Sequence, residues 1–392
     1  MTGWTITAGR TNEWDVGPSF SAVRQSQAAP GRGNELAKPL PPREPRSYPD
    51  PMQMTSPPRP QRLITVTGAG GFIGGHLVKR LQDDPTVRVR GVDKKPLSEW
   101  FQRFDGCDNI EGDLFDSEIA RKAVENASIV FHLAADMGGM GFIANNDVAC
   151  LNGAQMDVTV VRAAAEAHVD TIMFASSACV YPLRAQDHGA AALVESDAYP
   201  AQPPEGYGWE KLYVERLLSA YSDAGLLGIR LPRLHNVYGP HGAWMGGREK
   251  APAALCRKIA AARRLGIHEI PLWGTGTEIR SYCYVDDAVE GLIQLTMHSG
   301  FDTPVNIGSD SAISTVGLAE LISEIARWPV RVSLDRDKPA GVPSRNADIS
   351  LARREIAWEP RTNLRDGLSV VFREIDLKLS QLPRAALAKL AQ

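Results

Sequence analysis

Cys179 follows Ser177 by two residues in the run Ser176–Tyr181, and its thiol is suited to proton transfer or nucleophilic attack. Tyr207 and Lys211 have the i, i+4 spacing that stacks two side chains on one helix face. A phenol beside an ammonium can accept the proton of a hydroxyl that is being oxidised, and the nearby charge is expected to lower the pKa of the phenol. The sequence therefore combines a redox pair with a thiol that simple oxidation does not require.

A glycine-rich turn predicts a dinucleotide site. The apolar run Leu63–Thr67 leads directly into Gly68-Ala-Gly-Gly-Phe-Ile-Gly74, a GxxGxxG turn between a predicted strand and a predicted helix. Glycines let the backbone approach a pyrophosphate, and the helix N-terminus offers free N–H donors. Asp93, at the end of the next strand, suits the ribose hydroxyls of NAD, whereas Lys94 and Lys95 would suit the 2′-phosphate of NADP.

A further cofactor contact is expected after the third strand. Asp113 would meet the adenine, although a plain strand-end turn explains it equally well. The residues predicted to bind the cofactor are Gly68, Gly71, Phe72, Ile73, Gly74, Asp93, Asp113, Tyr207 and Lys211.

Short β-branched runs alternate with helical patterns after Arg62, which predicts an α/β fold of the Rossmann type with a doubly wound parallel sheet. The predicted strands are 63–67, 87–92, 129–133, 171–175 and 228–231, and the predicted helices are 71–81, 145–168 and 207–221. We assign 61–240 to the NAD-binding domain, with 282–308 returning to it, and 241–281 and 309–385 to a smaller, partly interleaved substrate domain.

Residues 1–60 are rich in proline and lack a periodic apolar pattern, so we expect a disordered tail. Met52 and Met54 directly precede the first strand and suggest an internal translation start.

The composition is that of a globular protein, with 392 residues, 43% hydrophobic residues and a net charge of −3. This charge gives no reason to expect nucleic acid or a membrane as a partner. The five cysteines lack metal-binding spacing, so we expect no metal and no disulfide framework, and a cytoplasmic location fits best.

The glycine turn, Asp93, Ser177 and the Tyr207/Lys211 pair together resemble the extended short-chain dehydrogenases/reductases over residues 61–380. This resemblance implies NAD as the cofactor and a sugar hydroxyl as the group oxidised. Further segments resemble the GDP-mannose 3,5-epimerase family of this superfamily, and these are 138–143, 176–182, 195–198, 235–240 and 246–253.

This resemblance implies the site residues and the partners. The expected catalytic residues are Ser177, Cys179, Tyr207, Lys211 and Lys250, with Cys179 and Lys250 as the acid–base pair. The expected substrate contacts are Gly138, Ser177, Cys179, Asn236, Glu249, Lys250, Ala251, Lys258, Glu278, Arg280 and Arg345. The resemblance also implies GDP-mannose as substrate and a homodimer formed by the helices 145–168 and 207–221. Two stretches, Leu183–Val194 and Ala261–Ile270, depart from the family pattern.

The residue types support an epimerisation. Oxidation of C4 of a hexose makes the protons on C3 and C5 acidic, so a base on one face and an acid on the other can invert these carbons before C4 is reduced again. The expected products are GDP-L-galactose, or GDP-L-gulose after inversion of C5 alone. The alternatives are a UDP-sugar 4-epimerase, a UDP-glucuronate decarboxylase, or a non-catalytic NAD-sensing regulator.

Overall fold

The computed structural model describes residues 61–136, 138–338 and 341–391. The predicted proline-rich tail and the suggested internal start lie outside these residues.

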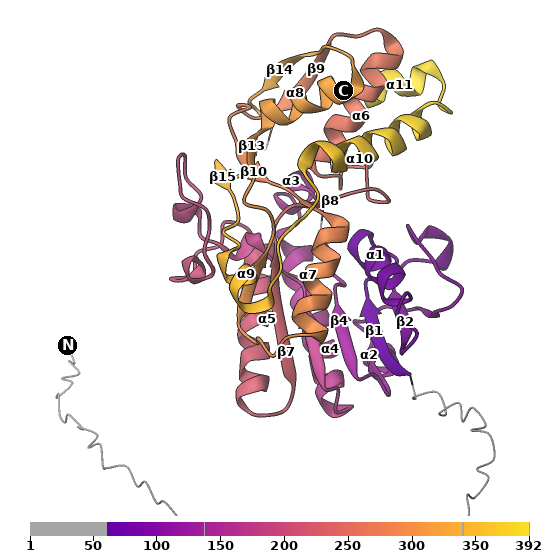
Figure 1. Cartoon of the computed structure of the whole chain (residues 1–392), viewed down its shortest axis with the longest axis vertical. Coiled ribbons are helices and arrows are strands. Elements are labelled where there is room, and N and C mark those ends of the chain that lie inside the picture. Colours follow the sequence, from indigo (N-terminus) through magenta and orange to yellow (C-terminus); the bar gives the residue numbers. More distant parts are fainter. Residues whose placement is uncertain (1–60, 137, 339–340, 392) are drawn as a thin grey trace, which may run out of the picture. The chain divides into compact units, whose positions relative to one another are not determined.

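A parallel sheet forms the centre of the described chain, in the order β12-β7-β5-β4-β1-β2-β3, with β6 also paired to β7 (Figure 1). Its strands are β1 (Arg62–Thr67), β2 (Val87–Asp93), β3 (Asp108–Glu111), β4 (Ile129–His132), β5 (Thr171–Phe174), β6 (Ser176–Ser177), β7 (Gly228–Leu234) and β12 (Pro304–Ile307). The order reverses on the two sides of β1, as in a doubly wound fold, so the predicted fold class is confirmed.

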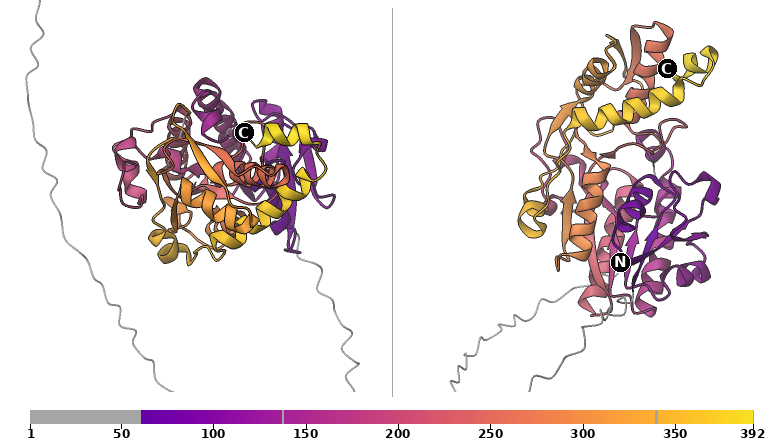
Figure 2. Two further views of the ribbon diagram at one scale, coloured as in Figure 1. Left: turned by 90° about the horizontal axis from the view of Figure 1, so that it is seen from above. Right: turned by 45° about the vertical axis from the view of Figure 1, so that its right-hand side comes forward.

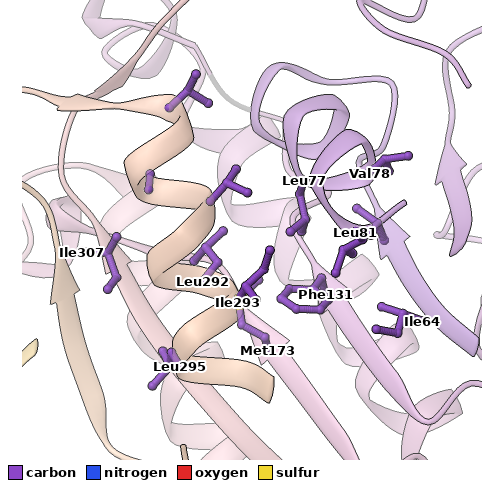
Figure 3. Packing of buried hydrophobic residues seen from close by; sticks show 14 of the residues in the cluster. Ile64, Leu77, Val78, Leu81, Phe131, Met173, Leu292, Ile293, Leu295 and Ile307 are labelled. Atoms are coloured by element: carbon purple, nitrogen blue, oxygen red, sulfur yellow. The ribbon is translucent and has the colours of Figure 1, made fainter. Parts of the chain in front are cut away.

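Helices cover both faces of this sheet. The side chains of β1 point alternately into the two apolar layers between the sheet and these helices. Ile64 and Val66 join the core beneath α1 (Phe72–Leu81) and α7 (Val285–Met297). Figure 3 shows this layer, in which Leu77 of α1 and Leu292 of α7 lie near Phe131 and Met173 of the sheet. Leu63 joins the opposite core, whose helices are α2 (Ser117–Val124), α4 (Asp147–Glu166) and α5 (Gly206–Asp223). The predicted helices thus form within a few residues of the expected bounds.

A second group of elements has an apolar core of its own (Figure 2). Its helices are α6 (Ala251–Leu265), α8 (Thr315–Ala326), α10 (Leu364–Leu379) and α11 (Arg384–Leu390), and its parallel strand pair is β9 (Glu269–Trp273) with β14 (Arg331–Asp335). The assignment of this region to substrate binding stays a prediction.

Short elements connect the two groups. Two small sheets are built from β10 (Ile279–Ser281), β13 (Ala312–Ser314) and β15 (Ser344–Arg345), and from β8 (Val237–Tyr238) and β11 (Cys283–Tyr284). The short helices are α3 (Met140–Ile143) and α9 (Ser350–Ile356), and the 3-10 turns are η1 (Leu97–Glu99), η2 (Ala178–Val180), η3 (Leu183–Ala185) and η4 (Glu195–Ala198).

Within the described ranges, the helices include none with both the length and the apolar character needed to cross a bilayer.

Candidate active site

The glycine turn after β1 has a conformation that side chains would block. Gly68 has a φ of +71°, and a Cβ on Gly74 would lie 2.1 Å from the carbonyl oxygen of Gly68. The turn therefore needs glycine at both positions, the first for its left-handed backbone and the second for close packing. It opens α1 and borders a cavity of about 530 Å³, a size within the usual range for ligand sites.

Gly74→Ala is expected to weaken NAD binding by about five- to 150-fold, because the added methyl group must displace the turn, and such overpacking costs about 1–3 kcal/mol. Calorimetric titration of the purified protein with NAD measures the change in the dissociation constant. Gly75→Ala is the matched control, since its Cβ would meet the Gln102 side chain at 3.1 Å rather than a backbone carbonyl. Equal affinity in the two variants would contradict the assigned role of Gly74.

Asp93 ends β2 at the cavity wall, and its Oδ1 accepts a hydrogen bond from the backbone N–H of Lys95 at 3.0 Å. The Lys95 ammonium donates to the carbonyl oxygen of Gly70 at 3.2 Å and lies 4.5 Å from the centre of the Phe101 ring. The Lys94 ammonium lies 3.8 Å from Asp136 Oδ2. Both lysines are therefore engaged within the protein, and the arrangement fits the ribose diol of NAD better than a 2′-phosphate.

The same cavity joins the cofactor residues to part of the expected catalytic set. Of the predicted site residues, those lining it are Gly68, Gly71, Phe72, Ile73, Gly74, Asp93, Asp113, Gly138, Ser177, Tyr207 and Lys250. Asp113 Oδ1 accepts from the backbone N–H of Phe115 at 3.1 Å, as in a turn, so the adenine contact stays a prediction. Of the described residues, Cys179, Lys211 and the remaining predicted substrate contacts are not part of the lining.

Ser177 and Cys179 are placed by a turn at the end of the sheet. Ser177 ends β6 and caps η2, because its Oγ accepts a hydrogen bond from the backbone N–H of Cys179 at 3.2 Å. Helix α5 packs directly against this turn, and a Cβ on Gly208 would lie 2.1 Å from the carbonyl oxygen of Cys179. Gly208 therefore lets Tyr207 approach Cys179, and both side chains lie in one small buried cluster.

Lys211 is fully enclosed beneath Tyr207. Its ammonium lies 4.4 Å from the centre of the Phe174 ring and 5.4 Å from that of Tyr207. Although burial favours the neutral amine, the carboxyl groups of Glu210 and Asp157 raise the pKa of Lys211 above its ordinary value. Lys211 is therefore a permanent cation.

The expected lowering of the phenol pKa is not present in the protein without cofactor. Burial raises the pKa of Tyr207 above its ordinary value, and the charge of Lys211 offsets only part of this effect. Two carboxyl groups also lie near this ammonium, with Glu210 Oε1 at 3.3 Å and Asp157 Oδ2 at 3.8 Å from Nζ. Tyr207 is a neutral phenol in this state. The lowering expected with the positive nicotinamide ring bound stays a prediction.

Arg345 lies directly against the thiol. Its Nη1 is 3.3 Å from Cys179 Sγ, and its Nε donates to the side-chain oxygen of Gln186. Gln186 is fully buried and donates from Nε2 to the carbonyl oxygen of Tyr181 at 2.8 Å. Gln186 is not among the site residues expected from the sequence, although it lies in the stretch 183–194 that departs from the family pattern. The departing loop therefore supplies the group that orients Arg345.

Gln186→Met is expected to slow the alkylation of Cys179 by iodoacetamide at pH 7.5 about five- to tenfold. Methionine keeps the packing but removes the acceptor that holds Arg345, and a hydrogen bond to a charged group is worth about 1.5–3 kcal/mol. Part of that loss reaches the sulfur that Arg345 contacts. Peptide mass spectrometry follows Cys179 specifically.

The matched control for this experiment is Arg184→Ala, which changes an exposed side chain of the same loop that bonds to Pro200 O at 2.9 Å. Alkylation of Gln186→Met at the unaltered rate would show that Gln186 does not act on the thiol through Arg345.

Positive groups converge on Cys179. Arg280 and Arg345 are direct partners in the pairing of β10 with β15. Burial, aided by the neighbouring Arg345, lowers the pKa of Arg280 to about 10. Lys250, the N-cap of α6, is half-buried, and burial lowers the pKa of its ammonium while Cys179 opposes the shift. The arrangement favours the binding of an anionic group at this point.

Two other predicted substrate contacts, Glu278 and Glu249, form hydrogen bonds within the protein. Both carboxylate oxygens of Glu278 accept hydrogen bonds within its own turn, from the backbone N–H groups of Thr275 at 2.7 Å and Gly276 at 2.9 Å. Glu249 binds the N–H of Gly247 at 2.7 Å, and its other oxygen lies 3.2 Å from Arg257 Nη2. Substrate contact through these two side chains stays a prediction and requires their present bonds to open.

Of the remaining predicted contacts, two donate hydrogen bonds to backbone carbonyl oxygens, and one is the first residue of a helix. Lys258 donates to the carbonyl oxygen of Pro271 at 2.9 Å, and burial, aided by Arg257, lowers the pKa of Lys258 to about 8. Asn236 has a φ of +40° and donates to the carbonyl oxygen of Ser281 at 3.0 Å. Ala251 is the first residue of α6.

The glycine loop packs against the backbone that carries Lys250. A Cβ on Gly139 would lie 2.5 Å from the carbonyl oxygen of Glu249, and the N–H of Gly139 donates to the carbonyl oxygen of Arg248 at 3.1 Å. The adjacent Gly138 lines the cavity. This close packing explains why the loop needs glycines.

The pattern of the NAD dependent epimerase/dehydratase family matches residues 64–308. The chain is 38% identical over 312 residues to GDP-mannose 3,5-epimerase of Arabidopsis thaliana, which covers 79% of this chain and 81% of the relative. It is 28% identical over 350 residues to UDP-glucuronic acid decarboxylase 3 of the same plant, with coverages of 87% and 96%. The crystal structure of UDP-glucose 4-epimerase with UDP-glucose from Thermotoga maritima superposes with a TM-score of 0.72, at 22% identity, over 81% of this chain and 99% of that one.

Proposed function

The chain belongs to the NAD-dependent epimerase/dehydratase family, and on that premise we propose that it is a GDP-mannose 3,5-epimerase. It would convert GDP-mannose to GDP-L-galactose, or to GDP-L-gulose when only C5 inverts. The observation that carries this proposal is the thiol of Cys179, held 3.3 Å from Arg345 Nη1 in the same buried cluster as Tyr207. Oxidation at C4 alone requires no such thiol.

NAD, when bound, would accept a hydride from C4 of the sugar and later return it. The residues present fit this group, because the glycine turn leaves no room for side chains and Asp93 ends β2 at the wall of the same cavity. Tyr207 Oη would take the proton of the C4 hydroxyl, and Ser177 Oγ would orient that hydroxyl. Lys211 would hold the nicotinamide ribose and keep a positive charge beneath the phenol.

The acid–base pair would act on the carbons next to the C4 ketone. Cys179 Sγ would remove a proton from one face, and Lys250 Nζ would return a proton to the other face. The lowered pKa of Lys250, caused by its burial, makes this ammonium a stronger acid than an exposed lysine. Loss of the proton leaves an enediolate, whose negative charge would be stabilised by the guanidinium groups.

Two buried polar atoms mark where a substrate would bind. Arg345 Nη2 and Glu205 Oε2 have no hydrogen-bond partner among the described residues. The charges of Arg345 and Arg280 both act on Glu205, whose pKa is nevertheless raised, first by burial. A sugar hydroxyl placed between Arg345 and Glu205 would satisfy both atoms, since it can donate to the carboxylate and accept from the guanidinium.

Incubation with GDP-mannose in deuterated water tests the proposal. A 3,5-epimerase incorporates solvent deuterium at C5, and also at C3 where that carbon inverts, and nuclear magnetic resonance locates the label. A C4 epimerase transfers only the hydride and leaves C3 and C5 unlabelled. Turnover without label at either carbon would therefore refute the assignment. Turnover of UDP-glucuronate but not of GDP-mannose would favour a decarboxylase instead.

The proposed homodimer would use α4 and α5. Side chains on these helices are exposed in the single chain, at 74% for Val148, 45% for Trp209 and 52% for Tyr213. A pair of helices with such apolar positions is suited to a two-fold contact with a second copy. Sedimentation equilibrium of the whole chain measures the state, and a mass equal to one chain at micromolar concentration would refute the dimer.

A further inference from the structure

Two carboxyl groups lie buried behind the Lys211 ammonium, between α4 and α5. Asp157 is fully buried, and Glu210 is 3% exposed. Lys211 Nζ lies 3.3 Å from Glu210 Oε1 and 3.8 Å from Asp157 Oδ2. In the described part of the chain, neither of these two oxygens has a hydrogen-bond partner of ordinary geometry. The proposed epimerase chemistry assigns these two acids no role.

A chain of hydrogen bonds holds Asp157 in place. The hydroxyl of Thr67 accepts from the N–H of Ala134 at 3.2 Å and contacts His132 Nδ1 at 2.7 Å. His132 Nε2 lies 2.9 Å from Asp157 Oδ1. Burial lowers the pKa of His132 to about 3, so the ring is neutral, and the Thr67 hydroxyl donates to Nδ1. The remaining ring proton is then on Nε2 and is donated to Asp157 Oδ1.

The charge count requires a proton on the second acid. One ammonium, that of Lys211, faces two buried carboxyl groups, so ionisation of both acids would leave one uncompensated negative charge, which costs several kcal/mol in a buried site. Burial raises the pKa of Glu210 well above its ordinary value, and the carboxylate of Asp157 reinforces this shift against the opposing effect of Lys211. Glu210 is a neutral acid in the free protein. The ionisable groups that face it are Cys150, Asp157, His132, Tyr207 and Lys211.

Glu210 lies immediately behind the cofactor cavity. Gly153 of α4 and Tyr207 of α5 both line this cavity. A Cβ built on Gly153 would lie 3.8 Å from Cγ and Cδ of Glu210. Because Gly153 has no side chain, little protein separates the carboxyl group from a positive charge placed at Tyr207.

We propose that Glu210 is a charge-compensating residue for the nicotinamide ring, ionising when the cationic ring binds beside Tyr207 and regaining a proton when the ring is in its reduced, neutral form. The proton passes to solvent on ionisation and is recovered from solvent afterwards, so one proton is released for each NAD⁺ bound. This inference rests on the proposed placement of the ring by Tyr207 and Lys211, and it is independent of the sugar that is epimerised.

The test is the dissociation constant of NAD⁺, and separately that of NADH, measured by calorimetry on the full chain between pH 6 and pH 9.5. Release of one proton makes NAD⁺ affinity rise with pH, by up to about tenfold per pH unit below the pKa of Glu210 in the free protein. NADH affinity stays constant. In Glu210→Gln, which keeps the shape of the neutral acid, the NAD⁺ affinity is lower at high pH and no longer depends on pH.

Two further variants test whether the second buried acid causes the pH dependence. Asp157→Asn removes the second negative charge, so Glu210 pairs with Lys211 as a carboxylate throughout the range, and the pH dependence also disappears. Glu320→Gln, an exposed position on α8, is the matched control and keeps the wild-type dependence.

The phenol is the competing source of the proton. Tyr207→Phe keeps the pH dependence if Glu210 is the source. Loss of the dependence in Tyr207→Phe with retention in Glu210→Gln would assign the proton to the phenol and overturn the inference, as would a constant NAD⁺ affinity in the wild-type protein. Neither result would bear on deuterium incorporation, so the proposed epimerase activity is judged separately.

Discussion

Cys179→Ala is expected to lower the incorporation of solvent deuterium at C3 and C5 of GDP-mannose by about 10²–10⁴-fold, the usual contribution of a positioned acid or base. The substitution removes Sγ and leaves Tyr207, Lys211 and the glycine turn intact. NAD binding and oxidation at C4 should therefore persist, and the absorbance of reduced nicotinamide should appear when the substrate is added. Nuclear magnetic resonance of the recovered nucleotide sugar measures the loss of label.

Cys107→Ala is the matched control, because Cys107 is a half-buried cysteine that packs against the core of the sheet, outside the cluster of Cys179. It should incorporate deuterium at the wild-type rate. If Cys179→Ala retains that rate as well, another group is the base, and the thiol has no part in the proton transfer.

The grouping of the expected cofactor residues around one cavity could be predicted because its signals are local. The turn Gly68–Gly74 and Asp93 each lie at a strand end that short apolar runs reveal, and the structure brings them to one cavity. Tyr207 and Lys211 occupy one face of one helix, so their spacing alone predicts their proximity. Such signals depend only on neighbours within a few residues along the chain.

The surroundings of the thiol could not be predicted in the same way, because they arise from distant segments. Arg345 faces Cys179 only because the two-residue strand β15 pairs with β10, and a strand of two residues has no detectable periodicity. Gln186 lies in a loop without any pattern, tied to β15 by the hydrogen bond from Ser344 N to Gln186 O at 2.9 Å. No spacing rule covers these contacts.

The pKa values of the site residues also depend on burial, which cannot be read from the spacing of residues along the chain. The motif predicts a cation under the phenol, and that cation is present. It does not show that burial raises the pKa of Tyr207 in the protein without cofactor, or that two carboxyl groups lie beside Lys211. Both features depend on tertiary packing and not on spacing along the chain.

Tyr207→Phe is expected to abolish both C4 oxidation and deuterium incorporation, each by about 10²–10⁴-fold, because without a C4 ketone the protons on C3 and C5 are not acidic. Phenylalanine keeps the ring that packs in the cluster with Ile143, Cys150 and Cys179. NAD binding should therefore remain. The absence of reduced nicotinamide on addition of GDP-mannose distinguishes this variant from Cys179→Ala, in which only the label is lost.

The control is Tyr213→Phe on the same helix, where the side chain is 52% exposed and away from the cavity. It should retain both activities. The order of the two steps follows from the pair of variants: if oxidation creates the acidity that Cys179 exploits, loss of Tyr207 must remove both signals, while loss of Cys179 removes one. Deuterium incorporation that survives in Tyr207→Phe would mean that proton exchange does not depend on C4 oxidation, and the proposed mechanism would fail at its first step.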